Sequence, residues 1–179
     1  MYSIIIPALI GAVSSLIGIF GKEVWIDYKK RKREQKVLAI RLHYILTKYV
    51  LDTAIQLQNT KAFIIHKAWT EHGWYSPLGN YNTKLLVLPL NIESLDWNNI
   101  ETEIISDITK LDLDIRIYSE QLSDIASVLY DDEVEKGYIE KSAILGLDAL
   151  KIIRLLSSKY DIPYTEIKLN DDTLQDFFT

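Results

Sequence analysis

The stretch "IISDITKLDLDIRIYSEQLSDIASVL", residues 104–129, decides the fold class because its apolar residues recur at regular intervals. They step alternately by four and three positions, which is the heptad spacing of a helix that buries one face. The residues between them are mostly polar. We therefore predict a helix whose apolar seam lies at the centre of a helical core: Ile104, Ile108, Leu111, Ile115, Tyr118, Leu122, Ile125 and Leu129.

A second helix is expected on the C-terminal side of this seam, over residues 133–160. Two neighbouring apolar stripes run along it, so it should pack against two partners. The acids at residues 131–133 interrupt the seam and suit a helix N-terminus, and residues 161–163 (Asp-Ile-Pro) should end the helix. Before the seam, Asn98 followed by Glu101 resembles a capping box.

A third, longer helix is expected on the N-terminal side. Residues 22–70 contain neither proline nor glycine, and their apolar residues recur at roughly helical spacing. We expect this helix to stop near His72-Gly73 and to project past its neighbours. Together the three helices predict an all-α fold with an antiparallel, coiled-coil-like three-helix bundle over residues 37–163.

One long irregular loop, residues 72–97, joins the first two helices of the predicted bundle. Loops of this length are uncommon in compact domains and often have a function. Its aromatic residues either form a partner-binding surface or hold the loop on the bundle. The acidic C-terminal tail, residues 164–179, is either a frayed end or a short docking peptide. The loop aromatics in question are Trp74, Tyr75 and Tyr81.

The N-terminal residues 1–21 carry no charge, and an apolar run of this length can cross a bilayer core of ~30 Å. A signal peptide would need bases before the apolar run and a small-residue cleavage site after it, and neither is present. A buried soluble helix would leave the basic block that follows unexplained. We therefore expect a single transmembrane anchor that is retained.

A basic juxtamembrane neck, residues 22–36, follows the anchor. The positive-inside rule places this flank in the cytoplasm, with the N-terminus outside the cell membrane. Trp25 and Tyr28 are positioned as interface aromatics, and the bases should attract anionic lipid. Reading "KKRKR" as a nuclear-localisation or nucleic-acid signal is the alternative. The neck bases are Lys22, Lys29, Lys30, Arg31, Lys32, Arg33 and Lys36.

Small residues form one stripe within the anchor. Such stripes allow helix backbones to approach closely in lipid, which predicts a homo-oligomer. The alternative is that glycine, alanine and serine are simply common in membrane helices. The stripe consists of Ala8, Gly11, Ser15 and Gly18.

Charge and composition narrow the function. The net charge of −5 combines +6 over residues 22–48 with −11 over residues 49–179, and this acidic remainder argues against a nucleic-acid partner. The chain has no cysteine, and His66 and His72 are six positions apart, a spacing that does not put two ligands on one helix face. No nucleophile elbow or glycine-rich phosphate loop is present. We therefore expect no enzymatic activity, no metal and no cofactor.

The sequence favours a single-pass, membrane-anchored helical module that holds an interaction surface at the cytoplasmic face and binds an unidentified protein. One alternative is a small membrane-acting effector, such as a toxin or defence component, that oligomerises through its anchor and disrupts the bilayer. The other is an unrecognised enzyme that uses the loop at residues 72–97.

Overall fold

The computed structural model describes the backbone of residues 2–70, 84–90, 97–128, 131–164, 166, 168–169 and 172–178. Side chains are described from residue 22 onward, with gaps. The fold is all-α, as predicted, and three long helices dominate the described chain. The elements are α1 (Tyr2–Thr70), the 3-10 turn η2 (Trp97–Asn99), α2 (Thr102–Val128), α3 (Asp131–Tyr160), β1 (Lys168–Leu169), β2 (Asp172–Thr173) and α4 (Leu174–Phe178).

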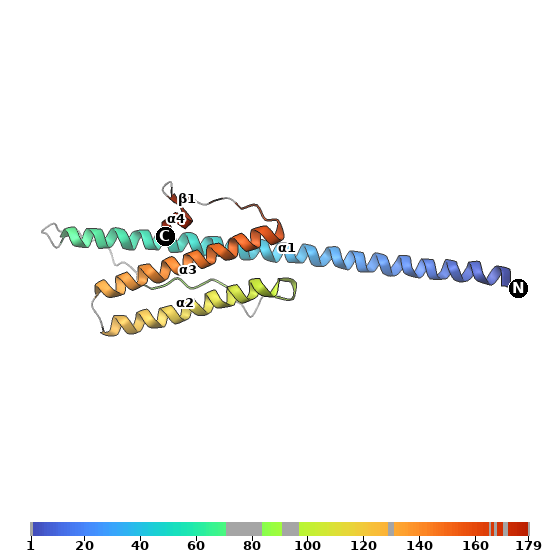
Figure 1. Ribbon diagram of the computed structural model, residues 1–179, viewed down its shortest axis with the longest axis horizontal. Helices are drawn as coiled ribbons and strands as arrows, with labels where there is room; N and C mark the ends of the chain where they lie inside the picture. The colour runs from blue at the N-terminus through green and yellow to red at the C-terminus, as the bar shows by residue number, and fades with distance from the viewer. Residues whose placement is uncertain are drawn as a thin grey trace.

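The first helix is much longer than its neighbours. α1 has 69 residues, which at 1.5 Å per residue gives a length of ~100 Å. Figure 1 shows its N-terminal part projecting beyond the ends of α2 and α3. The expectation that the first helix outreaches the bundle is therefore confirmed, and the expected stop near residue 72 lies outside the described residues.

The order of the helices differs from a simple antiparallel bundle. α3 lies between α1 and α2 and contacts both, and α1 and α2 run in the same direction, opposite to α3 (Figure 1). The prediction was therefore wrong for the first two helices. The long connection between them explains the difference, because it has room to return the chain to the end of the bundle where α2 begins.

The described part of this connection, residues 84–90, lies on the core without regular structure. Leu85 and Leu88 are buried, and Gln56 of α1 donates a hydrogen bond from Nε2 to the carbonyl oxygen of Lys84 at 3.0 Å. The run at residues 85–88 is thus a segment laid over the core.

The predicted seam of α2 faces α3. Ile104, Ile108, Leu111, Ile115 and Leu122 are buried, with exposed fractions of at most 5%. Tyr118 and Ile125 are half-buried, and Leu129 falls outside the described residues. On α3 the expected stripe is also buried, and its partners are α1 on one side and α2 on the other. The members of that stripe are Tyr138, Ser142, Leu145, Ala149, Ile152 and Leu156.

The end of α3 has the geometry of a Schellman motif. Asp161 adopts a left-handed backbone conformation with φ of 51°, and the Ile162 amide donates to the Ser157 carbonyl at 3.1 Å. Aspartate tolerates this conformation better than most residues do. The expected end of the helix at residues 161–163 is confirmed.

The start of α2 differs from the expected capping box. Residues 97–99 form a 3-10 turn and α2 begins at Thr102, so Glu101 precedes the helix instead of lying within its first turn. Its carboxylate accepts a hydrogen bond from Lys159 of α3, and its amide donates to the Tyr160 hydroxyl at 3.2 Å. Glu101 therefore joins the start of α2 to the end of α3.

The C-terminal tail packs onto the bundle. Leu174 and Phe178 of α4 are buried in the same core cluster as α1 and α3, with exposed fractions of 2% and 5%. β1 and β2 form an antiparallel pair in which Lys168 lies opposite Thr173. Arg154 of α3 also donates to the Gln175 side chain at 2.6 Å. Of the two alternatives for the tail, docking is the one observed, and its target is this chain's own bundle.

Within the described residues, no helix contains a stretch both long and apolar enough to span a membrane. The expected anchor at residues 1–21 is helical in its backbone from Tyr2, and its side chains lie outside the described part of the chain. The small-residue stripe falls in the same segment: Ala8, Gly11, Ser15 and Gly18.

Candidate functional site: the exposed length of α1 and two grooves

The basic neck is a solvent-exposed helix. Every residue from 22 to 34 is exposed, because this part of α1 lies beyond the bundle. The Lys29 ammonium lies 3.8 Å from the centroid of the Trp25 ring, and Lys32 lies 5.0 Å from that of Tyr28. These pairs are four residues apart, so one turn of helix brings each base over an aromatic face.

The neck combines the two chemistries that a bilayer interface recognises. Trp25 and Tyr28 are large amphipathic rings, 56% and 55% exposed. Seven bases and three acids lie between residues 22 and 36, and ammonium and guanidinium groups bind phosphate oxygens through charge-assisted hydrogen bonds. The structure leaves six of the bases exposed without an ion pair to a described residue: Lys22, Lys29, Lys30, Arg31, Lys32 and Arg33.

Lys36, the last base of the neck, contacts the bundle. Its Nζ donates to the Asp161 carbonyl oxygen at 3.2 Å and lies 3.9 Å from the Asp161 carboxylate. Since Asp161 is the residue that ends α3, this contact marks the point where α1 enters the bundle. Both side chains are largely exposed, so the ion pair contributes little to stability by itself.

Below the neck, α1 has a second apolar face that points away from the bundle. Val37, Ile40 and Tyr44 are 56%, 47% and 69% exposed, and they are spaced by three and four residues. The residues buried against α3, such as Ala39 and Leu42, lie on the opposite side of the helix. We define the outward face of α1 as Arg33, Val37, Ile40, Arg41, Tyr44 and Lys48.

Sequence reasoning missed this outward face. The apolar residues of the long helix were treated as one pattern, although they divide into a buried set and an exposed set. The signal was present in the spacing, because positions 37, 40 and 44 repeat as a short heptad of their own. Only the position of α3 shows which of the two faces is covered.

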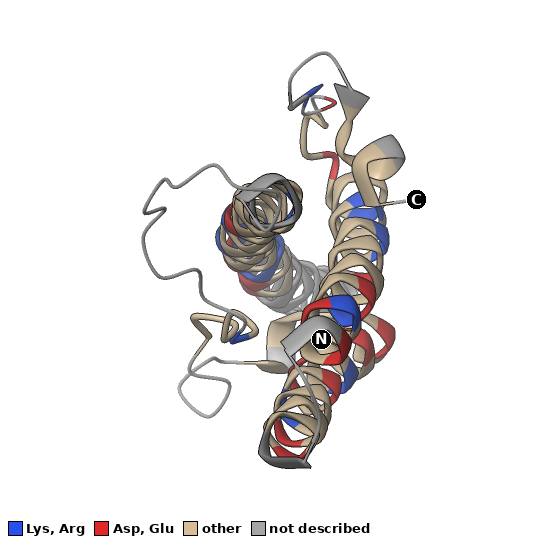
Figure 2. Cartoon of the chain, turned by 90° about the vertical axis from the view of Figure 1, so that its left-hand side faces the viewer, with Lys and Arg blue, Asp and Glu red and all other residues tan. Residues whose placement is uncertain are grey.

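Charge is divided between the helices. Residues 22–70 of α1 have eleven Lys/Arg and four Asp/Glu, whereas α2 has two Lys/Arg and six Asp/Glu. Figure 2, which looks along the bundle, shows acidic residues gathered on the α2–α3 pair. The exposed length of α1 is therefore the cationic part of the molecule.

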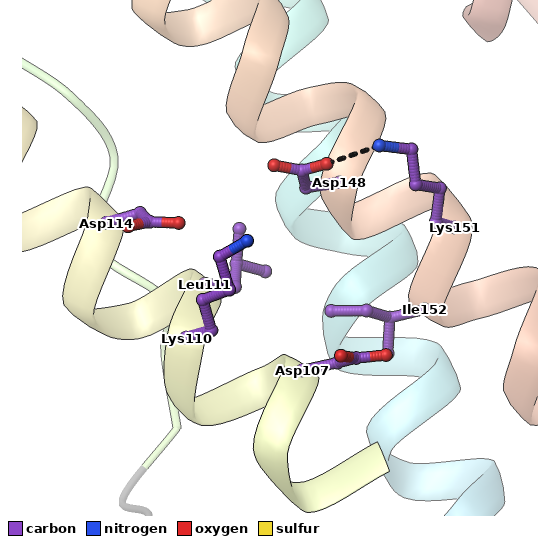
Figure 3. A pocket seen from close by; sticks show the side chains of 7 residues that line it. All are labelled: Asp107, Lys110, Leu111, Asp114, Asp148, Lys151 and Ile152. Carbon is purple, nitrogen blue, oxygen red and sulfur yellow. Dashed lines mark hydrogen bonds and ion pairs between the residues drawn. The ribbon is translucent and has the colours of Figure 1, made fainter. Parts of the chain in front are cut away.

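A shallow groove between α2 and α3 has charged walls and an apolar floor (Figure 3). Its volume is about 190 Å³, and Lys151 donates to the Asp148 carboxylate at 2.7 Å. Acids and bases alternate around it, which leaves only a small net negative charge. No group of metal-ligating side chains occurs among the described residues. The lining residues are Asp107, Lys110, Leu111, Asp114, Asp148, Lys151 and Ile152.

A larger and more apolar hollow of about 410 Å³ lies where residues 84–87 meet the C-terminal part of α2. Val87, beside it, is 74% exposed. Its wall combines leucine, valine and alanine with two serines and a single charged residue, Lys84, so it has no charged pair suited to acid–base chemistry. The loop aromatics expected near here lie outside the described residues: Trp74, Tyr75 and Tyr81.

The titratable groups with shifted pKa values are explained by packing. Burial lowers the pKa of His43 on α1 and raises the pKa values of Tyr49 and Tyr138, which lie within the α1–α3 contact. The pKa of Lys159 is raised by its hydrogen bonds to Glu101 and Glu103, the latter at 2.6 Å. None of these residues lines either of the two grooves described above.

Comparison with protein-family models, with curated proteins and with solved structures finds no match to this chain. The geometry of the described residues is therefore the basis for any functional assignment. The exposed length of α1, with its neck and outward face, is the candidate functional site.

Proposed function

We propose that this protein is a single-pass, membrane-anchored helical interaction module whose bundle lies at the cytoplasmic face of the cell membrane. The observation that carries the proposal is the neck: a helix exposed on all sides from residue 22 to residue 34, basic and aromatic, between an uncharged segment and a folded bundle. A soluble bundle has no need for such an extension, whereas a tethered one uses it as a spacer.

The chemistry of the neck supports contact with anionic lipid. Each exposed base close to a negatively charged leaflet contributes ~1 kcal/mol of attraction. The Trp25 and Tyr28 rings suit the headgroup layer, where an aromatic body and a polar edge are both accommodated. With bases only after the uncharged segment, the positive-inside rule puts residues 22–179 in the cytoplasm and the N-terminus outside.

The continuity of α1 supports the mechanical part of the proposal. Its backbone is helical from Tyr2 to Thr70 without a break, so the anchor segment and the bundle share one rod. Contact between two anchors would therefore bring two bundles together, and the proposed homo-oligomer works in this way. Confinement to a membrane raises the effective concentration of the copies and favours such contacts even when they are weak.

The placement is tested with the full chain fused at its C-terminus to either alkaline phosphatase or a fluorescent protein. We expect fluorescence, no phosphatase activity, and retention in the membrane pellet after a carbonate wash. The matched variant replaces Lys29, Lys30, Arg31, Lys32 and Arg33 with glutamine, and it should give a mixture of orientations because it removes most of the charge bias. A soluble product trimmed at the N-terminus would refute the proposal.

A membrane-potential dye separates the module from a membrane-acting effector. Overexpression of an interaction module should leave the potential unchanged. Depolarisation that disappears in Gly11→Leu or Gly18→Leu would instead support an effector whose anchors cluster in the bilayer.

A further inference from the structure

The outward face of α1 has the composition of a docking surface without an occupant. Val37, Ile40 and Tyr44 form a continuous apolar strip about two turns long, and the helices that cover the other side of α1 do not reach it. An exposed strip of this kind on a folded helix is typical of a partner-binding site.

The charges in line with this strip are basic, and one acid, Glu34, lies at its edge three residues before Val37. Arg33 lies one turn before Val37, Arg41 lies one turn after it, and Lys48 lies one turn after Tyr44. All three bases are exposed, and they make no ion pair or hydrogen bond with a described side chain. The face is therefore apolar along its middle, with Arg33 and Lys48 at its ends and Arg41 at one side.

We propose that the outward face of α1 binds an acidic amphipathic helix from a partner protein, with apolar residues at heptad spacing and Asp or Glu beside them. This deepens the proposed function, on which it rests, by naming the contact surface of the interaction module. From Arg33 to Lys48 the face spans ~22 Å, enough for about four turns of a partner helix. Apolar burial supplies the affinity, and the three bases select for acidic flanks.

A second copy fits this face less well. Copies anchored in one membrane are parallel, so pairing the outward faces would bring Arg33, Arg41 and Lys48 of the two chains together. The exposed apolar pair on α2, Leu113 and Ile117, offers no better match. It has charges of both signs beside it, with Lys110 and Arg116 close to Asp114 and Glu120, so it lacks the uniformly acidic edge that the three bases of α1 would select.

Anionic lipid is also a poorer match for this part of the helix. The outward face overlaps the neck only at its first residue, Arg33, and Tyr44 lies ~33 Å further along the helix than Lys22. In a module held roughly perpendicular to the bilayer, that distance exceeds the screening length of ~8 Å at physiological salt several times over.

The test uses the full chain in nanodiscs of phosphatidylcholine, a lipid without net charge, and a fluorescent synthetic helix of about three heptads. The probe has leucine at its core positions and glutamate at its flanking positions, and binding is measured by fluorescence anisotropy. We expect saturable binding that weakens at least about tenfold in the double variant Ile40→Ser with Tyr44→Ser.

Charge reversal makes the test specific. Arg41→Glu with Lys48→Glu should weaken binding of the glutamate probe at least about tenfold and should create binding of an otherwise identical lysine-flanked probe. The matched control is Leu113→Ser with Ile117→Ser on α2, which should leave both affinities unchanged. Circular dichroism checks that every variant is folded.

Any one of three results would refute the proposed docking surface. The first is that the α1 and α2 variants weaken probe binding equally, and the second is that charge reversal does not exchange the preference between the glutamate and lysine probes. The third is efficient disulfide formation between two copies of the Tyr44→Cys variant in the absence of probe. The last result would assign the face to a second copy. Failure of the membrane proposal can be told apart from failure of the docking surface, because a chain that does not enter nanodiscs can still be tested for binding to the same probes in solution.

Discussion

The ring of Phe178, near the end of the chain, lies directly over Gly146 of α3. A Cβ atom built at position 146 would be 2.5 Å from the ring Cζ and 2.7 Å from two further ring atoms, which is closer than nonbonded carbons approach. Phe178 is 5% exposed, and Phe177 beside it meets it edge-on at 5.7 Å between ring centroids. Gly146 therefore leaves the space on α3 that the Phe178 ring of α4 fills.

Gly146→Ala should destabilise the protein and release α4. If the Phe178 ring stays in place, the added methyl group overpacks the site, which typically lowers the stability of a protein by ~1–3 kcal/mol. If the ring is displaced, Leu174 and Phe178 become exposed to solvent. The matched control is Gly137→Ala, also on α3, where the added Cβ would be 3.1 Å from Cδ2 of Leu122, a tight contact that a shift of a few tenths of an ångström relieves. Both substitutions gain similar helix propensity, so their difference reports the contact. Thermal melts with limited proteolysis of the tail measure it, and equal stability of the two variants would exclude the steric argument.

Ile115→Asp should unfold the bundle. Ile115 is 2% exposed at the centre of the α2 seam, and an aspartate there would bury a charge without a partner. A loss of ~4 kcal/mol or more is expected, which is a large fraction of the stability of a typical domain. Ile117→Asp, two residues along on the exposed side of the same helix, should cost under ~1 kcal/mol. Urea titrations of both variants test this, and similar unfolding midpoints would show that the seam does not form the core.

Stability should fall as the pH decreases through ~6.5, the ordinary pKa of histidine. Burial lowers the pKa of His43 in the folded state, so the unfolded chain binds the proton more tightly and acid favours unfolding. The effect is absent above the unfolded pKa and grows below it. Urea midpoints between pH 7.5 and pH 5.5 should decrease for the wild type and decrease less for His43→Gln. Identical pH profiles would mean that other groups are responsible.

Single cysteines in the anchor should report the proposed oligomer, because the natural chain has no cysteine. Oxidative crosslinking in membranes should be strong for Gly11→Cys, Ser15→Cys and Gly18→Cys, on the small-residue stripe, and weak for Val13→Cys and Ile17→Cys on other sides of the helix. Uniform crosslinking at all five positions would show that the stripe is ordinary membrane-helix composition and that the anchors do not pack through it.

The sequence by itself determined the helices, because helix formation depends on local spacing. The seam from Ile104 to Leu122, the end of α3 at Asp161 and the long α1 all follow from periodicity and from where proline and glycine occur. The exposed bases and aromatics of the neck also follow from local composition. The membrane placement, the oligomer and the partner rest on sequence pattern and stay predictions.

Only the tertiary structure decided which surfaces meet. The parallel course of α1 and α2 depends on where a long connection returns, and no local pattern encodes that. The contact of Phe178 with Gly146 joins residues far apart in the chain, and a glycine within a helical sequence does not by itself predict such a contact. The outward face of α1 could not be predicted for the same reason. Val37 and Leu42 are both apolar, and only the position of α3 leaves Val37 exposed and buries Leu42.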